Sequence, residues 1–570
     1  MIPKVGLLAA LITVAAALVL ADAGDPPSRV ARLNYQSGTV SFRPGTVEDW
    51  TAASLNYPLT TGDHLWADVG AQGEMHIGST AIRMGSQTAL AILNLDDQMA
   101  QLSLTQGVLN VHIRYLGAQE AFEVDTPNVA VSLVQPGDYR IDVDGDNNIT
   151  TVTVRGGEAQ VNGGGAAFAV DAGQSARLSG VDTVSQDMGS PPPPDQFDGW
   201  CQMRDQREDQ SQSVHYISRQ TIGYEDLDQY GVWRQVPPYG WVWVPTGMAP
   251  GWAPYRYGHW VWVDPWGWTW IDDAPWGFAP FHYGRWAYAG GAGWVWVPGA
   301  MAASPVYAPA LVAFVGVGGV GVAAWFPLGP GEVYRPAYFA SAVYVRQANT
   351  PYVSNVMVIN NAVNVRYVNQ GVVGAVTVVP HDAFVGARPV ARALVVVPQR
   401  EIVTAQVVGS TAPIAPVRAS VLAGGSAVRT PPARVADRAV FARTAPPPPP
   451  VSFAARQQAL QANGGRPLDP AKVESLRATD QAARPALVRG PGAGVTRPAT
   501  APVRNDRPPT AQTPMARPTQ VPVINPVARP NEQPRTAPPA QVQERKAEVQ
   551  KTEKKAAKKT EKKEEKKDNR

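Results

Sequence analysis

The sequence predicts a mainly β protein, with a β-sandwich or roll, then tryptophan-rich β-hairpin repeats, then a disordered C-terminal tail. Three observations support this prediction. Short runs of alternating apolar and polar residues follow one another from about residue 28 to 185. Thirteen of the 17 tryptophans fall between Trp233 and Trp296, at repeated spacings. Beyond about residue 410 the composition changes to proline, alanine, arginine and threonine.

Residues 1–23 are typical of a secretory signal peptide. Lys4 precedes an apolar run over residues 5–20, and Ala21-Asp22-Ala23 then offers a cleavage site of the A-x-A type. A membrane anchor is the alternative, but a run of 16 residues is short for spanning a bilayer. We therefore expect a mature chain that begins near Gly24, has no transmembrane helix and is periplasmic or extracellular.

Residues 28–185 have the pattern of a β domain. Apolar residues alternate with polar ones, for example at Leu102 and Leu104 and again at Leu109, Val111 and Ile113. Such alternation is typical of strands with one buried face. Turn residues separate the runs, which favours an all-β sandwich or roll.

This segment resembles the FecR-like domain. Its resemblance rests on an ordered set of short motifs: Leu59-Thr60-Thr61-Gly62-Asp63, residues 74–79, Gln106-Gly107, Val124-Asp125-Thr126-Pro127, Gly156-Gly157-Glu158-Ala159 and Ala172-Gly173-Gln174. The resemblance implies a periplasmic β domain. In siderophore-signalling members a membrane helix tethers this domain to a cytoplasmic anti-sigma segment. The present chain departs from that plan through its cleavable signal, so the sigma-factor role is not carried over.

Residues 186–229 are expected to form a proline-rich linker and a short helix. The linker is Pro191 to Pro194, and Asp195 is placed to cap a helix with Phe197, Trp200 and Met203 on one side. Cys201 is the only cysteine of the chain, so no intramolecular disulfide can form. We expect its thiol to be packed on this helix.

Residues 230–298 contain three copies of one unit. A Tyr-Gly-x-Trp motif is followed, nine residues after its glycine, by Gly-Trp-x-Trp, and the unit recurs at offsets of 27 and 26 residues. Each copy is expected to be a β-hairpin. The wider segment from Phe197 to Pro298 resembles a tryptophan-rich domain of unknown function that follows FecR-like domains in exported proteobacterial proteins. The most distinctive motifs are Tyr257-Gly258-His259-Trp260 and residues 274–280.

The tryptophans of these hairpins are the candidate ligand-binding residues. Tryptophans two positions apart share a face of their strand, and aromatic faces stack sugar rings and nucleic-acid bases. The candidates are Trp241, Trp243, Trp260, Trp262, Trp268, Trp270, Trp294 and Trp296. The alternative, which we favour, is that these side chains build the core of a small domain. If they bind a ligand, a glycan fits better than nucleic acid because the repeats hold few basic residues.

Residues 299–409 are expected to be β-rich, and the chain beyond them disordered. The uncharged stretch over residues 299–331 favours a Gly-Gly hairpin around residues 315–322 over a membrane span. Residues 410–540 are rich in proline and arginine, and residues 541–570 in lysine and glutamate.

The charge of the chain is strongly polarised. Residues 24–200 hold 21 acidic and 8 basic residues, a net charge of −13, whereas residues 380–540 hold 8 and 20, a net charge of +12. We therefore expect the basic tail to meet something anionic, such as an envelope surface.

The sequence contains no recognisable catalytic motif. It lacks a nucleophile elbow, HExxH, a phosphate loop and CxxC, and its seven histidines are scattered without metal-ligand spacing. We therefore expect no catalytic residue, metal or cofactor and no nucleic-acid partner. The interpretation is a non-enzymatic binding or scaffolding protein of the cell envelope, with an envelope protein or glycan as partner. The alternatives are a glycan-binding module that uses the tryptophan face and a ligand-responsive signalling component of the FecR type.

Overall fold

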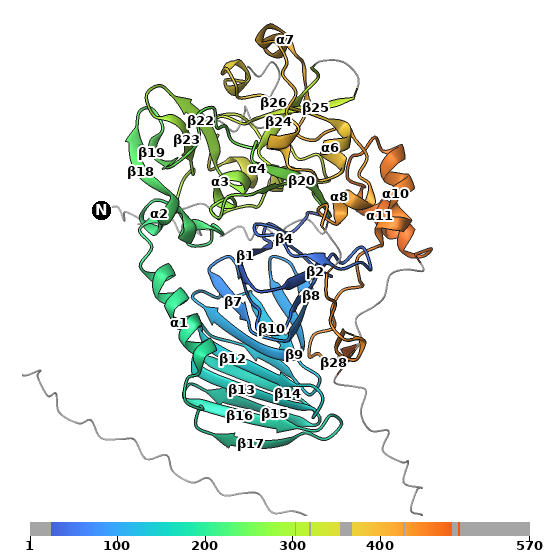
Figure 1. The fold of residues 1–570 in the computed structure, drawn as a ribbon. Coiled ribbons are helices and arrows are strands. Elements are labelled where there is room, and N and C mark those ends of the chain that lie inside the picture. Colours follow the sequence, from blue (N-terminus) through green and yellow to red (C-terminus); the bar gives the residue numbers. More distant parts are fainter. Residues whose placement is uncertain are drawn as a thin grey trace, which may run out of the picture. The chain divides into compact units, whose positions relative to one another are not determined.

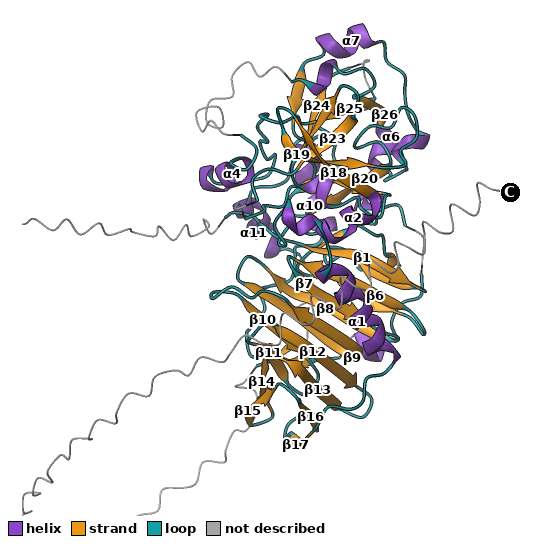
Figure 2. Ribbon diagram, turned by 90° about the vertical axis from the view of Figure 1, so that its left-hand side faces the viewer, coloured by secondary structure: helices purple, strands orange, loops and turns teal. Residues whose placement is uncertain are grey.

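The computed structural model describes residues 24–301, 304–317, 321–353, 367–425, 428–436, 438–480 and 488–490 (Figure 1). The predicted signal peptide, residues 354–366 of the stretch expected to be β-rich, and the chain from residue 491 onward lie outside these ranges. Strands and loops dominate what is described (Figure 2), which confirms the mainly β prediction. Within these ranges, no helix is both long and apolar enough to cross a bilayer.

Seventeen strands occupy the first part of the chain. They are β1 (Ala31–Ser37), β2 (Val40–Arg43), β3 (Thr51–Ala52), β4 (Pro58–Leu59), β5 (His64–Ala67), β6 (Gln72–Ile77), β7 (Thr80–Met84), β8 (Thr88–Leu95), β9 (Met99–Ile113), β10 (Ala121–Asp125), β11 (Ala130–Leu133), β12 (Gly137–Asp144), β13 (Ile149–Gly156), β14 (Glu158–Gly163), β15 (Ala166–Asp171), β16 (Gln174–Ser179) and β17 (Ser185–Gly189). We call this part the β domain.

The long strand β9 joins the two sheets of the β domain. Its first half pairs with β8 and with β10, and its second half pairs with β7 and with β12. Gly107 lies between the halves with φ +95°, where a side chain would collide with Thr88. Leu102 and Leu104 on one half, and Leu109 and Val111 on the other, are fully buried, which confirms the predicted alternation.

Helix α1 (Gln196–Asp209) follows the β domain. Asp195 caps it, and Asp198 completes a capping box, as the sequence predicted for this helix start. Phe197 and Cys201 are buried, whereas Met203 is exposed. The prediction that Met203 lies on the apolar side of the helix is therefore wrong. The second half of α1 contacts the β domain through ionic side chains, namely Arg204, Asp205 and Glu208. Short turns η1 (Ser213–His215), η2 (Tyr224–Asp226) and α2 (Leu227–Tyr230) complete the linker.

The three predicted hairpins are present. They are formed by β18 (Gly231–Val236) with β19 (Gly240–Pro245), β20 (Gly258–Val263) with β21 (Gly267–Asp272), and β22 (Arg285–Ala289) with β23 (Gly293–Val297). Helix α3 (Ala279–His282) precedes the last of them. The outer hairpins join through the pair Trp243 and Trp296 into one four-stranded sheet, while the middle hairpin stands apart. We call this part the hairpin domain.

A second four-stranded sheet lies in residues 299–409. Its order is β26 (Thr377–Pro380), β25 (Val322–Pro327), β24 (Val312–Val315) and β27 (Val407–Gly409). Strands β24 and β25 are antiparallel, with Phe314 opposite Trp325, as a hairpin requires; part of its turn lies outside the described residues. The helical elements are α4 (Ala342–Asn349), η3 (Asn369–Gly371), α6 (His381–Val385), η4 (Val390–Arg392) and α7 (Gln399–Thr404).

The prediction of disorder beyond residue 410 is wrong for the described part of that region. The structure places α8 (Arg418–Val421), α9 (Ala433–Ala436), β28 (Val440–Phe441), α10 (Phe453–Ala462), α11 (Pro470–Arg477) and β29 (Val488–Arg489) there. We call residues 410–490 the C-terminal segment. Leu460 and Val421 are buried in it, although its composition is poor in such residues.

The C-terminal segment is ordered by contacts with the rest of the protein. Arg429 pairs with Asp68 at 3.0 Å and Arg438 with Asp146 at 2.9 Å, both in the β domain. Arg418 pairs likewise with Asp49. Arginines of the described part of the basic tail thus meet carboxylates of the acidic domain in the same chain, while contact with an external anionic surface stays a prediction. A segment that packs on an existing core needs few apolar residues of its own. For this reason the prediction of disorder, which was based on composition, was wrong for this segment.

Candidate functional site

Seven of the eight candidate tryptophans lie in the core and form no open platform. The buried ones are Trp243, Trp260, Trp262, Trp268, Trp270, Trp294 and Trp296. These seven side chains therefore form the core that the alternative describes and not an exposed ligand face, although Trp262 also lines a second cavity described below. Trp241 differs, because 48% of its surface is exposed.

Several of the buried tryptophans also form hydrogen bonds through their indole N–H groups, whereas the Trp260 Nε1 has no partner among the described residues. Trp243 Nε1 donates to the Leu227 carbonyl, and Trp296 Nε1 donates to the Tyr283 carbonyl, each at 2.9 Å. Trp268 Nε1 donates at the same distance to Ile414 of the C-terminal segment. Burying large rings while satisfying their N–H groups is what a core tryptophan requires.

Trp241 lines a cavity of about 320 Å³ at the edge of the hairpin domain. The lining consists of Tyr239, Trp241, Arg285, Val297, Pro298, Gly299, Ala300, Pro330, Pro351 and Tyr352. The Trp241 ring packs on Tyr216 with 4.9 Å between centroids, and Tyr216 stacks on Trp233 at 4.6 Å. These contacts hold the Trp241 ring in place beside the cavity.

Arg285 places a cation at the wall of this cavity. The side chain is only 1% exposed, and its guanidinium lies over the Tyr352 ring at 4.5 Å. It donates to the carbonyls of Glu332 and Gly284 and to Asn349 Oδ1. No carboxylate of the described residues forms an ion pair with it. Burial lowers the pKa of Arg285, yet arginine remains charged in proteins.

The Trp241 cavity therefore combines aromatic walls with a buried cation whose hydrogen-bond partners are all neutral, while the Glu332 carboxylate acts on it only through its field. Aromatic faces favour flat or ring-shaped ligands, and a guanidinium without a direct ion pair favours an anionic substituent. Sequence reasoning identified Trp241 but missed Arg285, because nothing in the chain order brings Arg285 and Tyr352 to the same place.

A buried ionic network, which we call the ionic junction, connects the β domain to the linker. His76 on β6 lies 3.3 Å from Glu208 of α1 and 3.0 Å from Glu225 of η2. Arg83 on β7 pairs with Glu74 at 2.6 Å and with Glu208 at 3.1 Å. The remaining members are Arg32, Arg114, Arg204, Asp205, Arg207, Asp209 and Asp226.

The ionic junction has the donor atoms of a metal site, but cations of the protein already occupy it. Glu74, His76 and Glu208 are close enough to hold one ion. Arg83 and Arg204 both pair with Glu74, however. Burial alone would lower the pKa of His76, but Glu208 and Glu225 outweigh burial and raise it well above the ordinary value. Because Arg83 and Arg204 already neutralise Glu74, we describe this network as structural.

The raised pKa of His76 predicts a pH dependence of stability. The stabilisation is fully present below the unfolded-state pKa of about 6.5 and is lost as the pH rises through the higher folded-state pKa. We expect the difference in urea midpoint between wild type and His76→Gln to shrink as the pH rises from about 6 to about 9. His215→Gln, at an exposed position, is the control. A difference that stays constant over this range would contradict the assignment.

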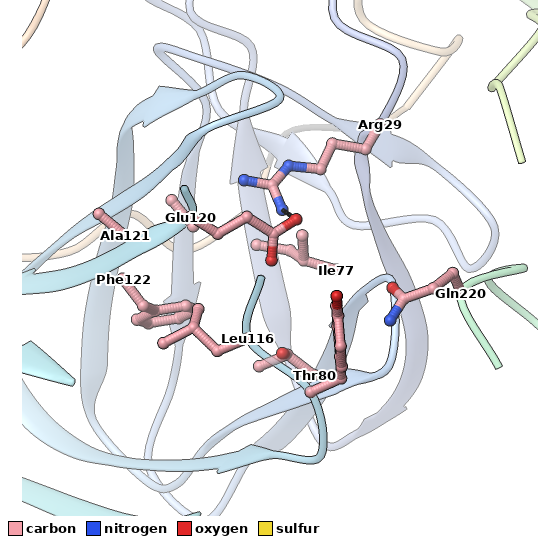
Figure 3. Close-up of a pocket in the computed structure, with 10 residues that line it drawn as sticks. Arg29, Ile77, Thr80, Leu116, Glu120, Ala121, Phe122 and Gln220 are labelled. Carbon is pink, nitrogen blue, oxygen red and sulfur yellow. Dashed lines mark hydrogen bonds and ion pairs between the residues drawn. The ribbon is translucent and has the colours of Figure 1, made fainter. Parts of the chain in front are cut away.

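A further hollow near the N-terminus of the β domain is too small for a ligand. Figure 3 shows the ion pair between Arg29 and Glu120 beside it, at 3.2 Å. Its volume is about 20 Å³, which is room for a single water molecule.

Comparison with known proteins finds a family match for part of the chain, and that family has no known activity. Residues 224–332, which contain all three hairpins, match a family of unknown function (DUF6600). No curated protein matches the chain. Two crystal structures of a proposed anti-sigma factor from Parabacteroides distasonis are similar to part of it at 11% identity, with TM-scores of 0.20 and 0.22. The matches cover 22% and 24% of this chain, and 59% and 64% of the solved chains.

Proposed function

We propose that the protein is an exported, non-enzymatic binding protein of the bacterial cell envelope and that the Trp241 cavity binds an acidic glycan. The single observation that supports an acidic glycan as the ligand is the buried Arg285 cation beside the exposed Trp241 ring. The compartment rests on the signal-peptide pattern of residues 1–23.

The composition of the cavity favours a sugar over the other ligands of aromatic sites. Tyr239, Trp241 and Tyr352 supply ring faces, and Arg285 supplies a single positive charge. Nucleic acids need several cations along a phosphate backbone, and this cavity has one. A sugar that carries one carboxylate matches one guanidinium.

Removing the Trp241 ring should weaken ligand binding strongly. Truncation of a tryptophan anchor costs about 2 kcal/mol, which is roughly 30-fold in Kd. We expect this loss for Trp241→Ala in calorimetric titration with a uronic-acid trisaccharide. Tyr288→Ala is the matched control, because Tyr288 is an exposed aromatic residue of the same sheet that does not line the cavity.

The charge of the ligand is tested on the wild-type protein. The carboxyl-reduced, neutral form of the same trisaccharide should bind at least tenfold more weakly, because it cannot pair with the Arg285 guanidinium. Equal affinity for the two trisaccharides would show that Arg285 does not recognise the carboxylate. An equal loss of affinity in Trp241→Ala and Tyr288→Ala would show that the ligand does not bind in this cavity.

Ligand-responsive signalling is the second candidate function. It is favoured by the ionic junction, in which one buried network links strands of the β domain to α1 and η2. Such a network could couple a change in the hairpin domain to the β domain, since Arg32 also donates to the Pro275 carbonyl at 2.6 Å. A comparison of hydrogen exchange in the β domain with and without the bound trisaccharide tests this coupling.

A further inference from the structure

A second cavity, of about 250 Å³, is lined by three separate segments of the chain. The β domain contributes Tyr57, Asp63 and Leu95, and the middle hairpin contributes Trp262 and Asp264. The C-terminal segment contributes the remaining wall: Val421, Pro450, Val451, Arg456, Leu468, Val473 and Arg477. Ligand sites often lie where separate parts of a protein meet.

Arg456, near the start of α10, lines this cavity and has one hydrogen-bond donor without a partner in the described part of the chain. The residue is 4% exposed, and its Nη1 pairs with Asp264. Its Nε donates to the Ser452 carbonyl at 3.4 Å. Its Nη2 is buried and has no hydrogen-bond partner among the described residues. Leaving a charged donor unsatisfied in the interior costs free energy, so an acceptor brought by a ligand would bind favourably there.

The charges of the cavity favour an anionic acceptor. Arg456 and Arg477 contribute two guanidinium groups and Asp264 one carboxylate. Arg456 pairs with Asp264, and Arg477 pairs at 2.9 Å with Glu474, which does not line the cavity. Burial raises the pKa of Asp63 to about 7, although the backbone N–H groups of Thr60 and Gly45 oppose the shift. At neutral pH this second carboxyl is therefore only partly charged. The summed charge of the lining is positive.

The other walls of the cavity favour an apolar chain. Leu95, Val421, Val451 and Leu468 contribute aliphatic side chains. The volume exceeds the roughly 150 Å³ of an engineered apolar cavity that binds benzene. A ligand of about ten non-hydrogen atoms is the scale that such a volume suggests.

We propose that this cavity is a second ligand site, distinct from the Trp241 cavity, which binds a small aliphatic carboxylic acid with its carboxylate on Arg456 and its chain among Leu95, Val421 and Leu468. Because the walls come from three segments, the bound acid fastens the C-terminal segment to the β domain and to the middle hairpin. A ligand that binds the folded state alone raises the melting temperature by mass action.

Octanoate is the probe, used with the full-length protein. We expect octanoate to bind in calorimetric titration and to raise the melting temperature, while octylamine, which has the same chain and the opposite charge, does neither. Arg456→Gln should lose octanoate affinity at least tenfold. Arg466→Gln, an exposed arginine just after α10 that does not line the cavity, should bind as wild type does.

A second variant covers the case in which Arg456→Gln loosens the C-terminal segment. Val473 is a half-buried residue of α11 that lines the cavity, so Val473→Trp should fill the space and abolish octanoate binding while keeping the charges. The proposal is overturned if octanoate binds Val473→Trp as it binds wild type. It is also overturned if 1-octanol binds wild type as tightly as octanoate, or if octanoate does not bind wild type.

Discussion

Replacing Trp260 with alanine is expected to lower the free energy of unfolding by about 3–5 kcal/mol. Trp260 lies on β20, is 1% exposed and is surrounded by other rings. Its centroid lies 5.3 Å from that of Trp325, 5.4 Å from that of Phe384 and 5.5 Å from that of Trp270. These neighbours come from different elements, so they cannot all move to close the cavity that alanine would leave.

Urea unfolding followed by tryptophan fluorescence measures this loss. Trp241→Ala is the matched control, because its ring is half-exposed and its removal leaves no enclosed cavity; we expect a loss below about 1.5 kcal/mol there. Acrylamide should quench the fluorescence of the folded protein poorly. Similar small losses for the two variants, together with strong quenching, would mean that the hairpin tryptophans are accessible after all.

Glu74→Ala is expected to destabilise the protein by about 3–5 kcal/mol. Glu74 is 1% exposed on β6, and it accepts from Arg83 at 2.6 Å and also pairs with Arg204 of α1. His76 approaches it at 3.4 Å. Removing the carboxylate leaves buried cations without a counter-charge, and that penalty exceeds the value of the lost ion pairs themselves.

Glu120→Ala is the control for this prediction. Glu120 pairs with Arg29 at 3.2 Å, but its side chain is 30% exposed, so its loss should cost no more than about 1 kcal/mol. The double variant Glu74→Ala with Arg83→Met should recover part of the loss, because it removes a stranded cation as well. A loss at Glu74 no larger than that at Glu120 would show that the junction is open to solvent.

The local fold could be predicted from the sequence because its signals are local. The alternation at Leu102, Leu104 and Leu109 fixes which face of β9 is buried, and turn residues fix where the hairpins reverse. The cap at Asp195 depends on residues within one helical turn. Each of these patterns is complete within about a dozen residues, so none of them needs the tertiary structure.

The candidate sites could be predicted only in part. The repeat identified Trp241 together with seven buried tryptophans of the same spacing, and only packing against other elements separates the two groups. Arg285 and Arg456 carry no local signal. Each became a candidate binding residue because of a partner that it lacks in the structure. Arg285 has no ion-pair partner, and Arg456 Nη2 has no hydrogen-bond acceptor among the described residues.

By itself, the sequence determined the β class, the strands of the β domain, the three hairpins and the polarity of charge along the chain. Tertiary structure alone decided that the outer hairpins pair through Trp243 and Trp296 and that seven of the eight candidate tryptophans are buried. It also decided that arginines after residue 410 pair with carboxylates of the acidic domain. Strand and turn formation depends on neighbours in the chain, whereas burial and ion pairing depend on which surfaces meet. A proline- and arginine-rich segment can be ordered when another domain supplies both the apolar surface and the opposite charge.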